Sequence, residues 1–297
     1  MSGINEFVSA RDPRRLVRHA TLRSRATLLR KGGLFVLALV AAALFAFPFY
    51  WLLRVAAVWP SESLYGSPPS LIIDDLSLYN FVRVYYAIPF AQYAINSVIV
   101  SAMAVASQLI FCSLAAYGLS MDFYGKKYVM GFIVAAMMVP FQTIFLTDYL
   151  ITRRLGLINT YPGLAIVVAV SVVNILVLKS AFEAVPDSMV DAARLDGASE
   201  LYILFGVYWP LSKAALSTTV ILAFVFSWNS YLWPLLIATQ DSYVTLPLGL
   251  ATFQSQMSGN FALQYAFTIM VLLPLLILFL LLQKYFIRSA VMSSIKT

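Results

Sequence analysis

Long apolar runs, separated by shorter polar segments, dominate this chain. Six of them reach the roughly 20 residues that a helix needs to cross the hydrocarbon core of a bilayer. They cover about residues 33–57, 94–120, 128–151, 161–181, 213–237 and 261–284. Membrane-spanning β-strands would instead show short segments of alternating polarity. The continuous runs therefore predict an all-α integral membrane protein with six transmembrane helices.

The composition also indicates that lipid surrounds these helices. Of the 297 residues, 61% are hydrophobic and 11% are charged, whereas a soluble domain carries about 25% charged residues. No small-residue cleavage site follows the first apolar run, so we expect a retained span and not a signal peptide. The predicted domains are a basic N-terminal arm, residues 1–32, and a transmembrane domain, residues 33–297.

Positive charge is concentrated on one side of the six predicted spans. The net charge is +7, and most of the 20 lysines and arginines lie in the arm or in connections on the same side as the arm. Cytoplasmic loops are enriched in these residues. We therefore expect a multi-pass protein of a bacterial-type plasma (inner) membrane with both termini cytoplasmic. The pair Arg153-Arg154, in an outer connection, is the exception.

The basic arm and the single cysteine narrow the choice of partners. Only Glu6 and Asp12 oppose the basic residues of the arm. Beside a membrane span, such an arm is expected to lie against anionic membrane lipid, and we predict no nucleic-acid partner.

Cys112 is the sole cysteine, which excludes an internal disulfide and a cysteine-based metal site. We interpret it as a small buried apolar residue and predict no bound metal.

Two connections between the spans are long. The outer one, residues 58–93, contains prolines and acidic residues, and it is either a docking surface or a plain tether. The inner one, residues 183–210, predicts a helix-turn-helix. Pro186 suits the start of a helix over 187–195, with Ser188 and Asp191 as a capping box. Asp196-Gly197 predicts a turn, a second helix is expected over 198–208, and Pro210 marks the entry to the fifth span.

The 183–210 loop combines small and acidic residues. Its alanines and Gly197 would let the backbone of another protein approach closely, and four carboxylates surround them. From the residue pattern alone the loop is either such a docking surface or a solvated amphipathic segment. The small residues are Ala192, Ala193, Gly197 and Ala198, and the acidic ones are Asp187, Asp191, Asp196 and Glu200.

This loop resembles the signature loop of ABC importer permeases, and its segment Ala192–Ser199 is similar to that of the maltose-permease-like carbohydrate group. That family has Glu-Ala-Ala, then Gly four residues later, and further on Leu-Pro. Here Asp191-Ala192-Ala193, Gly197 and Trp209-Pro210 occupy these places, with Asp for Glu and Trp for Leu. Other segments resemble the same group in the same order along the chain: Pro48-Phe49-Tyr50-Trp51, Asn96-Ser97, Ala115-Ala116-Tyr117, Met138-Val139-Pro140, Leu155-Gly156-Leu157, Asn159-Thr160, residues 228–235, residues 245–250 and Gln283-Lys284-Tyr285-Phe286.

The resemblance implies a non-catalytic permease subunit that forms half of a pathway for a sugar or related solute. Its implied partners are a second homologous permease subunit, two ABC ATPase subunits and an external solute-binding protein. ATP and Mg²⁺ would bind to the ATPases, and this chain would bind no cofactor. The residues expected to couple the loop to an ATPase are Asp191, Ala192, Ala193, Asp196, Gly197, Ala198 and Pro210.

Aromatic and amide side chains gather in the fourth and fifth predicted spans. Sugar sites favour aromatic faces together with amide and hydroxyl groups. Asn229 and Trp233 are one helical turn apart, so one helix would place them on a shared face. The alternative is that these residues pack against a partner subunit. The candidate substrate-pathway residues are Asn174, Trp228, Asn229, Tyr231 and Trp233.

An ion-coupled secondary transporter is the alternative function. Ionisable residues within spans are typical of proton coupling, but Arg54 and Asp148 lie near the predicted span ends. The single histidine, His19, lies in the basic arm, and no glycine-rich phosphate loop ending in Lys-Ser or Lys-Thr occurs. We therefore predict that this chain has no catalytic residues and does not hydrolyse ATP by itself.

Overall fold

The computed structural model describes residues 13–57, 76–257 and 259–294, and the side chains of 31–57, 76–257 and 259–283. These residues form helices joined by turns. The chain divides into two units, Met1–Val55 and Ala56–Thr297, and each is considered by itself. Residues 1–12 of the predicted basic arm, and residues 58–75 of the predicted outer connection, lie outside the described residues.

The described part of the first unit is helical and belongs to α1, Pro13–Ala56, whose last residue falls in the second unit. Its apolar part, Lys31–Ala56, is long enough to cross a membrane, in agreement with the predicted first span. The described part of the basic arm continues this helix without interruption. Near the end of α1 the Arg54 guanidinium lies 5.4 Å from the ring centroid of Trp51, which is the geometry of a cation–π contact.

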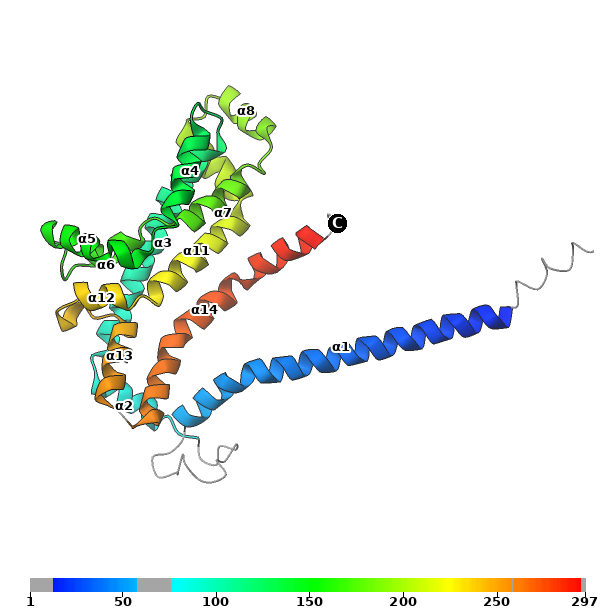
Figure 1. The fold of residues 1–297 in the computed structure, drawn as a ribbon, viewed down its shortest axis with the longest axis horizontal. Helices are drawn as coiled ribbons and strands as arrows, with labels where there is room; N and C mark the ends of the chain where they lie inside the picture. The colour runs from blue at the N-terminus through cyan, green and yellow to red at the C-terminus, as the bar shows by residue number, and fades with distance from the viewer. Residues whose placement is uncertain (1–12, 58–75, 258, 295–297) are drawn as a thin grey trace, which may run out of the picture. The chain divides into compact units, whose positions relative to one another are not determined.

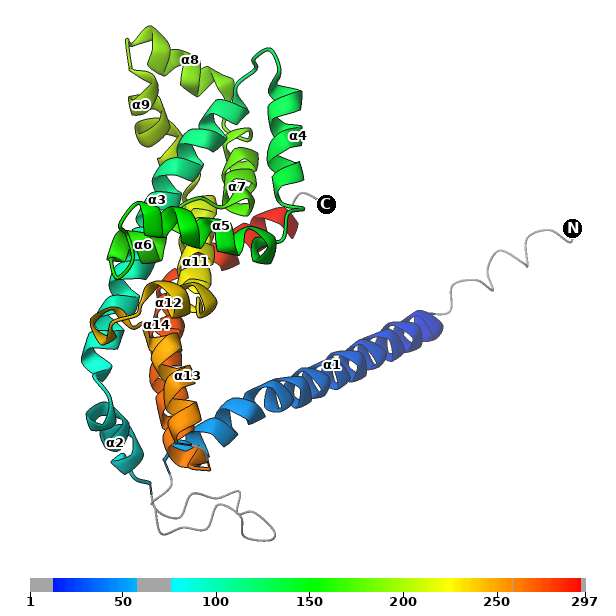
Figure 2. The ribbon, with the colours of Figure 1, turned by 60° about the vertical axis from the view of Figure 1, so that its left-hand side comes forward.

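Two helices of the second unit are long, continuous and apolar. They are α3, Phe90–Ser120, and α14, Phe261–Ser294, whose stretch Phe261–Gln283 is the apolar part. The short helix α2, Tyr79–Ala87, precedes α3. Both views show α3 running through the second unit from the neighbourhood of α2 toward α8 (Figures 1 and 2). Its closest neighbours are α7 and α11.

Other apolar segments are broken helices, which differs from the prediction of continuous spans. Residues 128–151 form α4, Lys126–Ala136, and α5, Phe141–Arg154, at 93° to each other. Pro140 precedes α5, and proline restricts the residue before it to extended conformations. Residues 161–181 form α6, Tyr161–Ala165, η1, Ile166–Val168, and α7, Val172–Phe182, with a bend of 59°.

The fifth predicted span is also divided. Helix α11, Lys213–Trp228, ends nine residues before the predicted limit, and α12, Leu232–Ile237, follows it. After η3, Asp241–Tyr243, helix α13, Leu246–Gln256, leads to α14. The described residues contain three helices able to cross a membrane, or up to six if each of three sharply bent pairs counts as one span; the third pair is residues 200–211 with α11.

Two hydrophobic clusters form the core of the second unit, and both include residues of α3. Tyr93 and Val100 of α3 belong to one cluster, together with residues of α6, α12, α13 and α14. Cys112 and Tyr117 belong to the other, together with residues of α7 and of the 183–210 loop. Cys112 is fully buried, as expected for a small apolar residue. Helix α3 therefore connects the loop to the opposite end of the unit.

A buried polar cluster lies at the Phe90 end of α3. Asn96 is fully buried, and its amide nitrogen donates to the backbone carbonyls of Ser242 and Val244 at 2.9 and 2.8 Å. Its oxygen accepts hydrogen bonds from Gln92 and from the Tyr161 hydroxyl. These bonds satisfy the backbone of the segment between α12 and α13 and fix it to α3.

Candidate functional site

The first half of the 183–210 loop is helix α8, Asp187–Leu195, as the sequence predicts. Pro186 is its N-cap residue, and no side chain caps the first turn, so the expected capping box of Ser188 and Asp191 does not form. Asp187 lies in this turn. A carboxylate in the first turn interacts favourably with the helix dipole. Asp187 therefore stabilises the start of α8 although no capping box forms.

Gly197 makes the predicted turn after α8. Its φ of +80° is a left-handed conformation that side chains disfavour, and a Cβ built there would meet no atom within 4 Å. The amides of Gly197 and Ala198 donate to the carbonyls of Arg194 and Ala193, both at 3.0 Å. The turn is therefore closed by its own backbone, and the space outside Gly197 is open.

The seven predicted coupling residues divide between two environments. Ala193 and Ala198 are partly buried and pack against the core cluster beneath the loop. The other five are exposed; Pro210 lies in the exit turn, and we call the other four the exposed edge of the loop. The exposed members are Asp191, Ala192, Asp196, Gly197 and Pro210.

The second half of the loop is helical but irregular. Helix α9, Glu200–Tyr202, begins at the N-cap Ser199, whose hydroxyl accepts a hydrogen bond from the Tyr202 amide. A π-helical turn, Ile203–Tyr208, and α10, Trp209–Leu211, follow. The chain then turns by 91° into α11. Because Pro210 has no amide hydrogen, it cannot continue regular hydrogen bonding through this turn.

Charged and aromatic side chains hold the loop against α3. The Tyr117 hydroxyl of α3 donates to Glu200, and the Arg194 Nε donates to the same carboxylate at 3.2 Å. The pKa of Glu200 is lowered, first by the hydrogen bond from Tyr117 and then by that from Arg194. Trp209 also donates to Ser113 of α3 at 3.2 Å. The loop is thus attached to one helix at two places.

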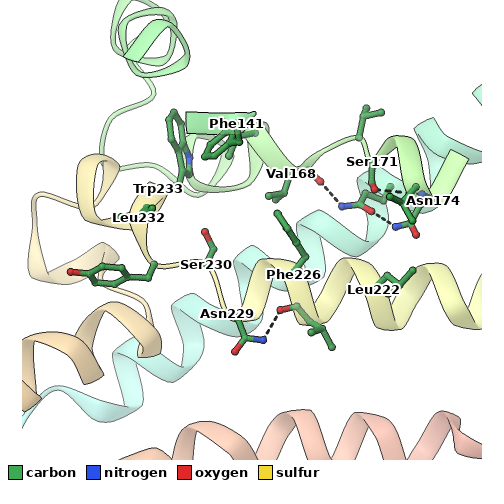
Figure 3. A pocket seen from close by; sticks show the side chains of 16 residues that line it. Phe141, Val168, Ser171, Asn174, Leu222, Phe226, Asn229, Ser230, Leu232 and Trp233 are labelled. Carbon is green, nitrogen blue, oxygen red and sulfur yellow. Dashed lines mark hydrogen bonds between the residues drawn. The ribbon is translucent and has the colours of Figure 1, made fainter. Parts of the chain in front are cut away.

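A cavity of about 730 Å³ is lined mainly by η1, α7, α11 and α12, with Gln108 of α3 and Phe141 of α5 completing its wall (Figure 3). Most of its lining is apolar, with valines, Leu222, Phe141 and Phe226 among the contributors. Polar groups reach it from several elements. They belong to Gln108, Ser171, Asn174, Asn229, Ser230 and Tyr231. An apolar cavity with a few convergent polar groups is the usual form of a small-molecule site.

One wall of the cavity is the break between η1 and α7, and side chains stabilise it. Gln108 of α3 donates to the Val168 carbonyl at 2.6 Å, and Asn174 donates to the Gln108 side-chain oxygen. Ser171 caps α7 by accepting from the Asn174 amide. Non-helical backbone at membrane depth is found where protein buries it or where it lines a cavity. Gln108 was not among the residues predicted from the sequence, because its role depends on this tertiary contact.

The structure brings four of the five predicted pathway residues to the cavity. Asn174, Asn229, Tyr231 and Trp233 line it, although α11 ends at Trp228 and so Asn229 and Trp233 do not share one helix face. The fifth, Trp228, is directed elsewhere: its ring stacks on Phe224, and its Nε1 donates to the Val271 carbonyl of α14 at 3.1 Å.

The comparison with protein families matches residues 108–291 to the model described as "Binding-protein-dependent transport system inner membrane component". This chain belongs to that family. The match includes both the 183–210 loop and the cavity.

Within the described residues, no group of three or more His, Cys, Asp or Glu side chains is placed to hold a metal ion.

Individual family members resemble the chain over most of its length. The arabinooligosaccharides transport system permease protein AraQ of Halalkalibacterium halodurans is 31% identical, covering 82% of this chain and 89% of AraQ. The trehalose/maltose transport system permease protein MalG of Thermococcus litoralis is 31% identical, covering 92% and 99%. A chain in the crystal structure of a bacterial ABC transporter involved in the import of the acidic polysaccharide alginate matches with a TM-score of 0.75 at 25% identity, covering 84% of this chain and 94% of that chain.

Proposed function

We propose that this chain is the transmembrane subunit of an ATP-driven importer and forms half of the pathway for a saccharide. The observation that carries the proposal is the rigid 183–210 loop with its exposed edge, in a member of the binding-protein-dependent transport family. Family membership favours this function over the ion-coupled secondary transporter. The relatives are named as permeases, which agrees with a non-catalytic role.

The proposed assembly contains a second homologous permease, two ABC ATPases and an external solute-binding protein. ATP and Mg²⁺ bind to the ATPases. Both termini and the 183–210 loop face the cytoplasm, where lysine and arginine accumulate. Residues 191–197 contact an ATPase. Their exposed edge is open to a partner, and Gly197 leaves room for the backbone of that partner to approach closely.

The cavity supplies this chain's share of the pathway. Asn229, Ser230 and Tyr231 offer amide and hydroxyl groups beside aromatic and apolar walls, a combination that suits a saccharide. The named relatives transport arabinooligosaccharides and trehalose or maltose, and the structural relative imports alginate. We therefore place the substrate in the saccharide class. Trp228 is left out of this pathway because it bonds to α14.

The test of this function is Gly197→Trp in the assembled importer. The site has open space within this chain, so the chain itself bears only the left-handed strain of about 1–2 kcal/mol. We expect the variant to insert and the ATPase to stay active, while sugar transported per ATP falls about tenfold, equivalent to about 1.4 kcal/mol of lost coupling. The measurement uses proteoliposomes and a sugar that stabilises the cognate binding protein in a thermal-shift screen.

Gly156→Trp is the matched control. Gly156 also has positive φ, +70°, and open space around its Cβ, but it follows α5 and lies outside the 183–210 loop. It should keep the wild-type ratio of transport to ATP hydrolysis. Normal transport by Gly197→Trp would contradict the proposed docking of the loop.

A further inference from the structure

Helix α3 touches both the 183–210 loop and the wall of the cavity. Its Ser120 end carries Tyr117, which bonds to the loop, and nearer its middle lies Gln108, which holds the break between η1 and α7. The two residues are nine positions apart on one uninterrupted helix, a separation of about 14 Å along its axis. A displacement of Tyr117 along the helix axis therefore reaches Gln108 undiminished, provided that α3 moves as a rigid body.

The Glu200 carboxylate is the junction between α3 and both halves of the loop. One of its oxygens accepts from the Tyr117 hydroxyl, and the other accepts from Arg194 Nε of α8 at 3.2 Å. Arg194 also lies 3.8 Å from Asp191 on the exposed edge of α8. Glu200 itself belongs to α9. One carboxylate therefore joins α8, α9 and α3.

Aromatic packing supports this junction. The Tyr208 ring lies 5.1 Å from the rings of Tyr117 and of Phe182 at the end of α7, both in edge contact. Tyr117 is 7% exposed, so its hydroxyl is held in one place. The Glu200 side chain, in contrast, is 57% exposed. The fixed donor belongs to α3, and the accessible acceptor belongs to the loop.

We propose that Glu200 is a positioning residue for coupling: it makes the 183–210 loop and α3 move as one body. Movement of the loop then passes through α3 to Gln108 and to the cavity wall at Val168 and Asn174. This inference rests on the proposed function, because it takes the loop as the element that the ATPases displace. It adds that α3 receives the movement of the loop, and that Glu200 connects the loop to α3.

The test measures whether the loop and α3 stay together when nucleotide drives the importer. Spin labels are placed at Ser188→Cys on α8 and at Gly118→Cys on α3, where a Cβ meets no atom within 4 Å. Cys112→Ala removes the native thiol. The distance between the labels is measured by pulsed electron resonance in the complete importer in nanodiscs, without nucleotide and after trapping with MgATP and vanadate.

In the chain with native Glu200 we expect the same single label distance in both states. In Glu200→Gln and in Tyr117→Phe we expect the distance to shift or broaden on trapping, and transport per ATP to fall about threefold. A buried charge-assisted hydrogen bond would cause a larger fall when lost. The effect is smaller here because water competes for the half-exposed Glu200 carboxylate. The double variant should be no worse than the worse single one, because the two changes remove one shared interaction.

Tyr202→Phe is the matched control for the loss of a hydroxyl. Tyr202 lies in α9 next to the junction, and its side chain is 64% exposed. It should keep the native distance and coupling. Assembly with the ATPases and basal ATP hydrolysis should stay normal in every variant, which separates a positioning role from a general loss of structure.

Two results would overturn the inference while leaving the proposed function intact. The first is an unchanged label distance in Glu200→Gln with normal transport per ATP. The second is a change of the label distance on trapping in the chain with native Glu200, which would mean that loop and helix move separately. In both cases Gly197→Trp would still uncouple transport. Failure of the importer to contain ATPase subunits would instead refute the proposed function.

Discussion

The two ends of α3 are held by polar clusters of opposite character. At the Phe90 end, Asn96 is fully buried and bonds without any formal charge to two backbone carbonyls. At the Ser120 end, Tyr117 bonds to Glu200, whose carboxylate is more than half exposed and also bonds to Arg194. One cluster is buried and neutral, whereas the other is charged and open to water.

The difference indicates how costly it is to break the contacts at each end. Breaking the Asn96 cluster would leave the buried Val244 carbonyl without this partner, which costs the full desolvation penalty of that group. At Glu200 water can replace a lost partner, so each contact there is individually weak. The Phe90 end therefore fixes the segment between α12 and α13 through a buried hydrogen bond, whereas the Ser120 end holds the loop through a carboxylate that is open to water.

The strongest test of this comparison is Asn96→Leu. The change removes the donor to Ser242 and Val244 and leaves both carbonyls and the Tyr161 hydroxyl without this partner. We expect a loss of roughly 2–4 kcal/mol in the free energy of unfolding, at 1–3 kcal/mol for each unsatisfied buried group. Thermal unfolding in detergent would measure it.

Gln92→Leu is the control for this change. Gln92 contacts the same cluster, donating to Asn96 and to the Ser242 carbonyl, but it lies on the exposed side. Its loss should cost about 1 kcal/mol or less, because water can take its place. If both variants are equally mild, the cluster is not the fixed end of α3.

A smaller effect is expected from acid at the other end. The native hydrogen bonds from Tyr117 and Arg194 lower the pKa of Glu200 below its ordinary value of 4.5. A depressed carboxylate pKa stabilises the fold above the unfolded pKa, and this contribution is lost as the pH falls through the folded pKa. The melting-temperature difference between native chain and Glu200→Gln should be constant from about pH 6 to 8 and should shrink below about pH 4.

The melting temperature of the Tyr117→Phe chain should depend more weakly on pH over the same range. The reason is that this substitution removes the largest cause of the lowered Glu200 pKa. A difference that grows on acidification would mean that the Glu200 carboxylate destabilises the native loop. Such an increase would contradict a stabilising junction between Glu200, Tyr117 and Arg194.

Local sequence signals predicted the 183–210 loop well. Pro186 and the Asp196-Gly197 pair set the limits of α8, because a proline and a left-handed glycine act on the backbone at their own positions. The left-handed turn at Gly197 needs no distant contact. The capping box was wrong because the helix starts at Asp187, which places Ser188 inside its first turn instead of at the N-cap.

The break between η1 and α7 and the cavity could not be derived in this way. Residues 169–171, where η1 and α7 separate, contain neither proline nor glycine. At this break Gln108, 60 residues away along the chain, donates to the Val168 carbonyl. Trp228 was assigned to the pathway by its neighbours in sequence, but its indole bonds to α14. Periodicity identifies apolar segments, while their bends and side-chain directions follow from tertiary contacts.

Site-directed crosslinking of the loop tests the central claim most directly. Single cysteines at residues 191–199, in a Cys112→Ala chain, would be treated with a short bifunctional reagent in membranes that contain the whole importer. We predict crosslinks to an ATPase subunit from the exposed edge, with Asp191 and Asp196 among the reactive positions, and none from Gly156. The account would be contradicted if no position in the loop reached an ATPase, or if the loop reacted only with reagent confined to the external side.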